Sequence, residues 1–316
     1  MESIVVTDGF TLNPGDLDWR MFESFGEVVV YPRTSSDEVI DRCRNATIII
    51  TNKTPISVDV IKKCSRLKFI AVTATGYNVV DIASAAKRNV SVCNVPGYGT
   101  DSVAQHTIAL LLAITNAVGP NVADVAKGGW SKSHDWCYTT KPIIELSGKI
   151  LGIVGYGRIG RKVAEIARAF GTKVIFCNRT LINDEGSSSL EEVFRKSDFI
   201  SLHCPLTADN NGFINSSILK LMKPSAFLIN TARGQLINEA DLRDVLINRK
   251  IAGAALDVLS VEPPPVDHPL LGIENCLITP HNAWLSFEAR KRIFDITHKN
   301  IESYLQNAPQ NLVTVS

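Results

Sequence analysis

Three side chains that could act together on a carbonyl compound are Arg233, Glu262 and His281. A guanidinium can bind an anion and polarise a carbonyl group, an imidazole can transfer a proton, and a carboxylate can hold that imidazole in place. Each of the three follows an apolar run typical of a buried strand. Because the carboxyl ends of parallel strands share one edge of a sheet, where ligands bind, we expect these side chains to converge on one cleft.

Each of these residues also has an ordinary structural interpretation. Arg233 and Glu262 could form an ion pair that serves no ligand. His281, which follows a strand and a proline, could be a packing residue. Taken singly, the three residues do not decide between structure and chemistry.

A glycine-rich segment gives the second chemical signal. Gly155, Gly157 and Gly160 form the pattern G-x-G-x-x-G directly after an apolar run and directly before apolar residues at helical spacing. The first glycine permits a tight turn, the second lets the backbone approach a pyrophosphate, and the third lets helix and strand pack closely. The N–H groups and dipole of the helix N-terminus favour phosphate there. We predict a dinucleotide site; a structural glycine turn and a methyltransferase are the alternatives.

The residues after the next strand bear on which dinucleotide binds. An acidic residue normally stands about 20 residues after the glycines and binds the ribose hydroxyls. Asn178, Arg179 and Thr180 occupy this place instead. They offer neutral donors and a guanidinium suited to a 2′-phosphate, which an aspartate would repel. The sequence therefore favours NADP over NAD, unless Arg179 is only a solvated loop residue and NAD binds through weaker contacts.

Composition narrows the class of protein. The 316 residues suit two domains, and 45% hydrophobic with 21% charged residues is typical of a globular protein. The net charge of +1 gives no polycationic character, so small molecules are expected as partners rather than nucleic acid. The seven cysteines are scattered, which argues against a metal site and a disulfide framework. Without a signal peptide or a long apolar stretch, we expect a cytoplasmic protein that does not span a membrane.

Strand-like and helical segments alternate along the chain, which predicts an α/β fold with parallel sheets. Five strands are expected in the first hundred residues, and a long helix follows over 102–118. Six more strands begin with the glycine motif, the count of a full dinucleotide-binding sheet. The final helix, about 287–305, is expected to return and pack on the first domain.

The chain resembles the D-isomer-specific 2-hydroxyacid dehydrogenases over nearly its whole length, especially their glycerate dehydrogenase or hydroxypyruvate reductase branch. The matching stretches are residues 72–81, 94–106, 146–160 and the segments around Arg233, Glu262 and His281. The resemblance implies a Rossmann dinucleotide-binding domain over 102–284. It also implies a discontinuous, flavodoxin-like substrate domain over 1–101 and 285–316, and a homodimer with the bridge-helix region at its interface.

The same resemblance assigns roles. It makes His281 the general acid/base, Glu262 the partner that favours its protonated form, and Arg233 the group that binds the substrate and polarises its carbonyl. It assigns substrate contacts to Arg233, His281 and the backbone N–H groups of Ala74, Thr75 and Gly76. The implied cofactor contacts are Gly155, Gly157, Arg158, Ile159, Gly160, Asn178, Arg179, Thr180, His203, Cys204, Pro205, Thr231, Ala232, Arg233, Asp257, His281 and Trp284. No metal is expected.

The expected activity is hydride transfer between NAD(P)H and a short 2-keto acid of the hydroxypyruvate or glyoxylate type, giving the D-2-hydroxy acid. Trp284 and Leu285 stand where many family members have small residues, and they are expected to narrow the pocket. His106 and His134 are expected to be packing or surface residues, and His268 a loop residue. The alternative is a nucleotide-sensing interaction protein on the same fold that turns over no substrate.

Overall fold

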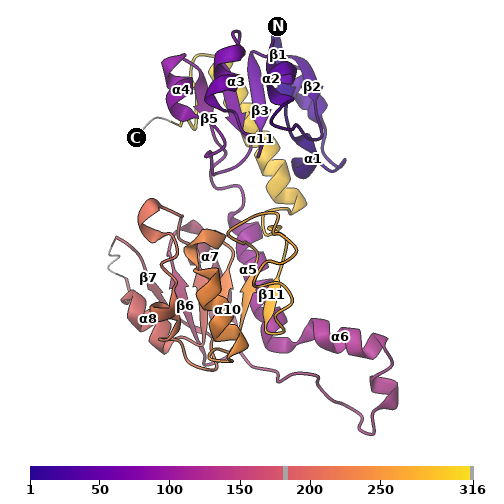
Figure 1. Ribbon diagram of the computed structural model, residues 1–316, viewed down its shortest axis with the longest axis vertical. Coiled ribbons are helices and arrows are strands. Elements are labelled where there is room, and N and C mark those ends of the chain that lie inside the picture. Colours follow the sequence, from indigo (N-terminus) through magenta and orange to yellow (C-terminus); the bar gives the residue numbers. More distant parts are fainter. Residues whose placement is uncertain (181–183, 314–316) are drawn as a thin grey trace. The chain divides into compact units, whose positions relative to one another are not determined.

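The computed structural model describes residues 1–180 and 184–313, so the end of the predicted segment 285–316 lies outside the described residues. The chain divides into two compact units (Figure 1). The first unit comprises residues 1–99 and 285–316, and the second comprises residues 100–284.

The first unit contains a five-stranded parallel sheet. Its strands are β1 (Glu2–Val6), β2 (Gly26–Val30), β3 (Ile48–Thr51), β4 (Phe69–Val72) and β5 (Ser91–Cys93). The order β2-β1-β3-β4-β5 is that of a flavodoxin-like sheet. β3 and β4 are buried along their whole length, as expected for central strands of a parallel sheet that is covered on both faces.

Short helices and the long C-terminal helix complete this unit. They are α1 (Gly9–Leu12), α2 (Val39–Cys43), α3 (Val58–Lys63), α4 (Ile82–Lys87) and α11 (Phe287–Leu305), with a 3₁₀ turn over Trp19–Phe22. On α11, Phe294 packs on Trp19 with ring centroids 4.5 Å apart, and Tyr304 stacks on Phe69 of β4 at 4.4 Å. The last helix therefore belongs to the same hydrophobic unit as the first strands.

The second unit contains a six-stranded parallel sheet, which confirms the predicted α/β class. Its strands are β6 (Ile150–Val154), β7 (Lys173–Cys177), β8 (Phe199–Leu202), β9 (Phe227–Asn230), β10 (Gly253–Leu256) and β11 (Cys276–Ile278). Side chains alternate between two buried faces: Leu228 packs into one cluster and its neighbour Ile229 into the other. Helices therefore cover both faces of this sheet.

The sheet has the six strands that the sequence predicted, and their order differs from that of the simplest dinucleotide-binding sheet. The order is β11-β10-β9-β8-β6-β7, whereas six strands of the simplest dinucleotide-binding sheet place the third strand outside the second. Here that outer position is reduced to an isolated parallel bridge between Phe176 and Ser187. The count of six is reached because β11 extends the opposite edge.

The helices of the second unit are α5 (Thr100–Asn116), α6 (Val118–Ala126), α7 (Arg158–Ala169), α8 (Leu190–Lys196), α9 (Ser216–Leu219) and α10 (Glu239–Ile247). Three 3₁₀ turns cover Trp130–Lys132, Ala208–Asn210 and Gly234–Leu236. The helix expected over 102–118 ends at Asn116, because Ala117 adopts a left-handed conformation with φ of 49°. This break starts the separate helix α6.

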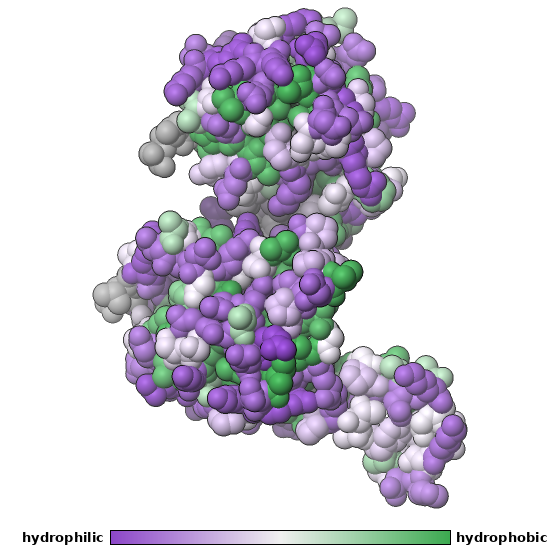
Figure 2. All heavy atoms as spheres, in the orientation of Figure 1, coloured by the Kyte–Doolittle hydropathy of each residue, from purple (hydrophilic) through white to green (hydrophobic). Residues whose placement is uncertain are grey.

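Helix α6 and the following turn form an arm, residues 117–145, that stands away from the sheet of its own unit (Figure 1). No residue of α6 is buried, and Figure 2 shows apolar and polar side chains interspersed on the arm. Among the described residues, no single helix is long and apolar enough to span a membrane. The pair α5 and α6, bent by 59°, meets that test only when the two are taken together.

Candidate active site

The glycine turn joins β6 to α7 at the carboxyl edge of the second sheet. Gly155 has φ of +97°, and a β-carbon there would lie 2.5 Å from the backbone nitrogen of Cys204. A β-carbon at Gly160 would lie 2.4 Å from the carbonyl oxygen of Gly155. At Gly157 a β-carbon would meet nothing within 4 Å. The first and third glycines are thus required by packing, whereas the second leaves open space at the N-terminus of α7, where a pyrophosphate fits.

Asn178 lies just after β7 and faces the glycine turn. Its Oδ1 accepts the backbone N–H of Tyr156 at 2.6 Å, a contact that the sequence did not indicate. The Tyr156 ring stacks on Phe176 with centroids 3.8 Å apart, and the Arg161 guanidinium lies 4.6 Å from its centroid. The sequence suggested Asn178 as a neutral donor to the cofactor, and the structure adds that its side-chain carbonyl oxygen fixes the glycine turn.

The two residues after Asn178 are exposed, as is Arg158 in the first turn of α7, while Ile159 is half-buried. Arg179 and Thr180 therefore extend from the end of β7 into solvent. A guanidinium in this place is accessible to a charged ligand at the adenosine end of a dinucleotide.

The segment His203-Cys204-Pro205 follows β8 and packs against the glycine turn. The N–H of His203 donates to the carbonyl oxygen of Val154 at 2.7 Å, and its Nε2 shares a hydrogen bond with Ser201 Oγ at 2.9 Å. Burial lowers the pKa of His203 well below its usual range and raises the pKa of the Cys204 thiol. Both side chains are therefore uncharged near neutral pH.

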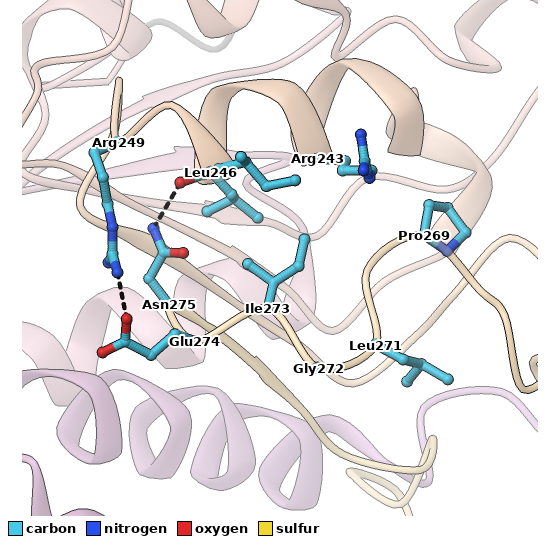
Figure 3. A pocket seen from close by; sticks show the side chains of 10 residues that line it. Arg243, Leu246, Arg249, Pro269, Leu271, Gly272, Ile273, Glu274 and Asn275 are labelled. Carbon is cyan, nitrogen blue, oxygen red and sulfur yellow. Dashed lines mark hydrogen bonds and ion pairs between the residues drawn. The ribbon is translucent and has the colours of Figure 1, made fainter.

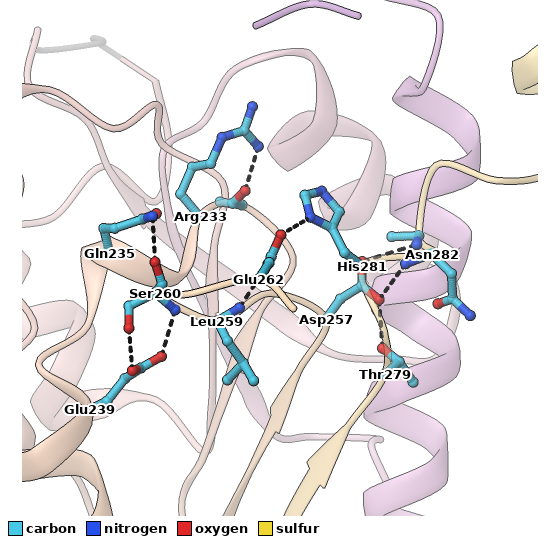
Figure 4. A network of polar contacts seen from close by, with 12 residues as sticks. Arg233, Gln235, Glu239, Asp257, Leu259, Ser260, Glu262, Thr279, His281 and Asn282 are labelled. Carbon is cyan, nitrogen blue, oxygen red and sulfur yellow. Dashed lines mark hydrogen bonds and ion pairs between the residues drawn. The ribbon is translucent and has the colours of Figure 1, made fainter. Parts of the chain in front are cut away.

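Glu262 and His281 are in direct contact (Figure 4). The Nδ1 atom of His281 lies 2.5 Å from Glu262 Oε2, and the other carboxylate oxygen accepts the N–H of Leu259 at 2.9 Å. The two side chains are 30% and 34% exposed, so the site is reachable from solvent. With Nδ1 bonded to a carboxylate, Nε2 is the nitrogen that can exchange a proton with a ligand.

His281 is held in an uncommon backbone conformation, with φ of 51°. Its N–H donates to the carbonyl oxygen of Asp257 at 2.8 Å, and the Asp257 carboxylate accepts the N–H groups of Asn282 and Ala283 at 3.0 Å each. Burial alone would raise the pKa of Asp257, but hydrogen bonds from His106, Thr279 and these N–H groups lower it below its usual value. A buried carboxylate thus fixes the loop that carries His281.

His106, on α5, belongs to this network, although its sequence suggested only packing or surface. Its Nε2 lies 3.1 Å from Thr279 Oγ1 and 3.4 Å from Asp257 Oδ1. The sequence could not indicate this contact because α5 and the end of β11 are far apart along the chain. The position of His106 at the end of the segment 94–106, which matched the family, was the one available signal.

Arg233 extends from the loop after β9 on the same side as Glu262 and His281 (Figure 4). It is exposed, and its Nη1 donates to the carbonyl oxygen of Ala232 at 2.6 Å. Gly234, the next residue, would bring a β-carbon to 1.9 Å from the carbonyl carbon of Leu259. The loops that carry Arg233 and Glu262 therefore touch through their backbones.

The remaining predicted contacts of this unit differ in accessibility. The Thr231 hydroxyl lies 2.9 Å from Thr107 Oγ1 on α5, and Thr231 is only 8% exposed, so its hydroxyl already has a partner within the protein. Ala232 and Trp284 are half-buried at the ends of their loops.

The predicted substrate turn, Ala74 to Gly76, lies in the first unit after β4. The N–H of Val95 donates to the carbonyl oxygen of Ala74 at 3.0 Å, and Asn94 Nδ2 donates to that of Thr75 at 2.8 Å. Within the part of the chain that the structure describes, the backbone N–H groups of Thr75 and Gly76 donate to no acceptor. Both residues are exposed, so these donors are accessible to an anion.

A hollow of about 350 Å³ in the second unit lies away from these residues (Figure 3). It is formed by the end of α10 and residues 269–275, which precede β11 and therefore lie at the amino edge of the sheet. Its Arg249 is paired with Glu274, Nη2 to Oε2, at 2.5 Å. We assign it no role in catalysis. No group of three potential metal ligands occurs in residues 1–180 or 184–313.

Comparisons with known proteins agree with this geometry. Residues 108–283 match the NAD binding domain of the D-isomer specific 2-hydroxyacid dehydrogenases. A hydroxypyruvate reductase from Blautia hydrogenotrophica is 47% identical over 318 residues, which cover 98% of this chain and 99% of the relative. A glycerate dehydrogenase from Methylorubrum extorquens is 39% identical, covering 94% and 95%. The chain belongs to the D-isomer specific 2-hydroxyacid dehydrogenase family, which confirms the resemblance.

A solved structure supports the fold over the same length. The acyclic imino acid reductase Bsp5, in complex with NADPH and D-Arg, is 36% identical with a TM-score of 0.86, and the match covers 98% of this chain and 99% of that one. The protein is therefore an NAD(P)-dependent oxidoreductase with the two-sheet architecture of its family.

Proposed function

We propose that this protein reduces short 2-keto acids of the hydroxypyruvate or glyoxylate type to D-2-hydroxy acids. The observation that carries the proposal is the contact between Glu262 and His281, 2.5 Å apart at the carboxyl edge of the dinucleotide-binding sheet. Related proteins act on this class of substrate: one is named a hydroxypyruvate reductase and another a glycerate dehydrogenase.

His281, Glu262 and Arg233 each have a separate role in the proposed reaction. The bound nicotinamide supplies a hydride to the carbonyl carbon. The protonated His281 gives its Nε2 proton to the carbonyl oxygen, while Glu262 at Nδ1 balances the positive charge of the imidazolium. Arg233 binds the carboxylate and draws electron density toward the carbonyl oxygen, so the carbon accepts hydride more readily.

The first unit, as the substrate domain, contributes the turn at Thr75 and Gly76. Its two exposed N–H groups bind the substrate carboxylate, as a backbone concavity binds an anion. The dinucleotide-binding domain is the second unit, and Trp284 and Leu285 at the boundary restrict the substrate to short side chains. The domain limits proposed from the sequence, 101 and 285, differ by two residues or fewer from the division of the chain at residues 99 and 285.

The direct test is consumption of NADPH or NADH, followed at 340 nm, with glyoxylate, hydroxypyruvate, pyruvate and longer keto acids. Turnover should be greatest with glyoxylate and hydroxypyruvate, and the glycerate formed from hydroxypyruvate should be the D isomer on a chiral column. A rate that requires an added amine would instead assign imine reduction, the activity named for Bsp5. Cofactor binding without turnover on any acid would favour the nucleotide-sensing alternative.

We further propose that NADP is preferred over NAD. Asn178 replaces the acidic residue that would repel a 2′-phosphate, and the exposed Arg179 follows it directly. The NADPH bound to the related imino acid reductase is consistent with this preference.

The exposed apolar side chains of the arm support a homodimer. Val118, Val122 and Val125 lie at helical spacing on α6 and are 45% to 63% exposed, and Trp130 and Trp136 are 54% and 87% exposed. Exposed apolar side chains at helical spacing on a helix with no buried residue favour a protein interface. We propose that a second copy of the chain covers it.

The cysteines support a cytoplasmic location. All seven are free, and six of them are buried or half-buried. Unpaired thiols in this number suit a reducing compartment.

A further inference from the structure

A second pair of a glutamate and a histidine lies beside the proposed catalytic pair. His268, which the sequence suggested was a loop residue, has a side chain only 4% exposed, and Glu239 at the start of α10 is 11% exposed. His268 Nε2 lies 3.1 Å from Glu239 Oε2. The N–H of Leu270 donates to Nδ1 at 3.4 Å, so Nε2 is the nitrogen that carries the proton toward the carboxylate.

The Glu239 carboxylate accepts two hydrogen bonds from Ser260 (Figure 4). Its Oε1 accepts the backbone N–H of Ser260 at 2.8 Å, and its Oε2 accepts the Ser260 hydroxyl at 2.5 Å. On the other side, Gln235 Nε2 donates to the carbonyl oxygen of Ser260 at 2.8 Å. The peptide on each side of Ser260 is therefore fixed.

These hydrogen bonds to Ser260 also affect Glu262, because Ser260 follows Leu259 in the backbone. Leu259, the residue before Ser260, donates its N–H to Glu262 Oε1 at 2.9 Å, and this bond turns Oε2 toward His281. A rotation of the peptide at Ser260 would move the Leu259 donor and the Glu262 side chain together. Ser260 and Leu259 thus link the Glu239 carboxylate to the contact between Glu262 and His281.

Other titratable groups of the described residues face this network. Cys276 on β11 is close to Glu239, and burial, with a smaller contribution from Glu239, raises the pKa of its thiol to about 12, so it stays neutral. Among the residues drawn in Figure 4, Asp257 and Arg233 are charged groups on the side of the Glu262 and His281 pair. The hydrogen bonds of Ser260 in the described residues go to Glu239 and Gln235, and not to Asp257 or Arg233.

We infer that Glu239 and His268 are positioning residues, which hold Ser260 so that the Glu262 carboxylate stays against the His281 imidazole. The inference rests on the proposed function, because it assigns the pair a purpose only if His281 donates the proton. It adds two residues whose side chains have no contact with the reacting atoms.

The test compares variants that weaken the hydrogen bonds of Glu239 with Ser260 and His268 to different degrees. Glu239→Gln should weaken both bonds to Ser260, and kcat should fall about 10- to 100-fold, since a displacement near 1 Å has that effect on catalysis. Ser260→Ala removes one bond with little structural cost and should act in the same direction, more weakly. His268→Leu should resemble Glu239→Gln, whereas His268→Gln retains a donor at the Nε2 position and should restore activity.

Two readouts separate positioning from mere stability. The alkaline limb of the kcat profile should move to lower pH in Glu239→Gln, because a displaced carboxylate no longer favours the imidazolium. The His281 imidazole titration, followed by ¹H–¹⁵N NMR and assigned by its loss in His281→Ala, should move the same way; the chain has only six histidines. The KM for cofactor should not change.

Asp241→Asn is the matched control. Asp241 lies on the same helix, is equally half-buried, and accepts the N–H of Ser216 at 2.7 Å, remote from the loop of Ser260. It should lower the melting temperature without moving the titration. If Glu239→Gln behaves like this control, the pair is structural and the inference is wrong.

Failure of the proposed function would look different. Wild-type protein without turnover on any keto acid, or full turnover in His281→Ala, would overturn the proposed reaction. A titration midpoint that moves in Glu239→Gln would even then support positioning of Glu262, whereas an unmoved midpoint would overturn it.

Discussion

Gly234 and Leu259 are in backbone contact, and a β-carbon on Gly234 would stand 1.9 Å from the Leu259 carbonyl carbon. Since Arg233 precedes the glycine and the Leu259 N–H holds Glu262, this single approach sets the spacing between a cation and a carboxylate of the site. No flexible side chain is involved that could move aside.

Gly234→Ala should therefore damage activity more than stability. The added methyl group must displace one of the two loops, at a cost of about 1–3 kcal/mol in the free energy of unfolding. We expect kcat/KM to fall at least tenfold, measured by keto-acid reduction at 340 nm, with urea unfolding in parallel. Gly119→Ala is the control, because a β-carbon there meets nothing within 4 Å; equal losses in both variants would refute the role of the contact.

His281→Ala should lower kcat about 10²- to 10⁴-fold, the usual contribution of a general acid. Binding of NADPH, measured by fluorescence titration, should change little because the glycine turn is untouched. In the wild-type protein the reduction rate should fall as the pH rises, since the imidazolium is the proton donor. A rate that is independent of pH over the alkaline range would contradict the assignment.

Asp257→Asn should destabilise the loop of His281 by about 1–3 kcal/mol, because one of its donors loses a charged acceptor. The pKa of Asp257 is lowered in the folded protein, so its contribution is complete above about pH 4, the unfolded value, and disappears as the pH falls through the lower folded value. The difference in unfolding free energy between wild type and variant, from urea titrations, should be constant near neutrality and shrink in acid. If this difference in unfolding free energy grew in acid, the proposed contribution of the Asp257 carboxylate would be contradicted.

Arg179→Ala tests the cofactor preference. Loss of a charge-assisted bond should raise the KM for NADPH about tenfold or more and leave that for NADH nearly unchanged. Arg195, on α8, is also an exposed arginine, and Arg195→Ala should change neither the KM for NADPH nor that for NADH. A wild-type preference for NADH would already exclude the proposal.

Val122→Asp tests the arm. A buried, unpaired charge at a dimer interface is costly, so sedimentation analysis should show the variant as a monomer while the wild type is a dimer. Val266 is a fully exposed valine outside the arm, and Val266→Asp should remain dimeric. A monomeric wild-type protein would refute the proposed assembly.

Local patterns in the sequence predicted the parts of the site that depend on neighbouring residues. The glycine spacing identified the turn before α7, and the positions of Arg233, Glu262 and His281 after strands identified the edge of the sheet. The positions of the turn and of the strand ends could be predicted because strand ends and glycine turns have short-range signatures.

Contacts between distant segments were not predictable in this way. His268 and Glu239 stand 29 positions apart, and neither belongs to a motif, so nothing in the sequence paired them. The side chain of Asn178 has two opposite hydrogen-bonding ends, and only the structure shows that Oδ1 faces Tyr156.

The close approach of Gly155 to the backbone of Cys204 has a thermodynamic consequence for the cofactor. The turn for the pyrophosphate and the segment proposed for the adenosine side are joined by direct contact, and His203 is further bonded to Val154 at the end of β6. The glycine turn and the segment after β8 therefore cannot move apart independently. Little conformational entropy remains to be lost there when the dinucleotide binds, so more of its contact energy appears as affinity.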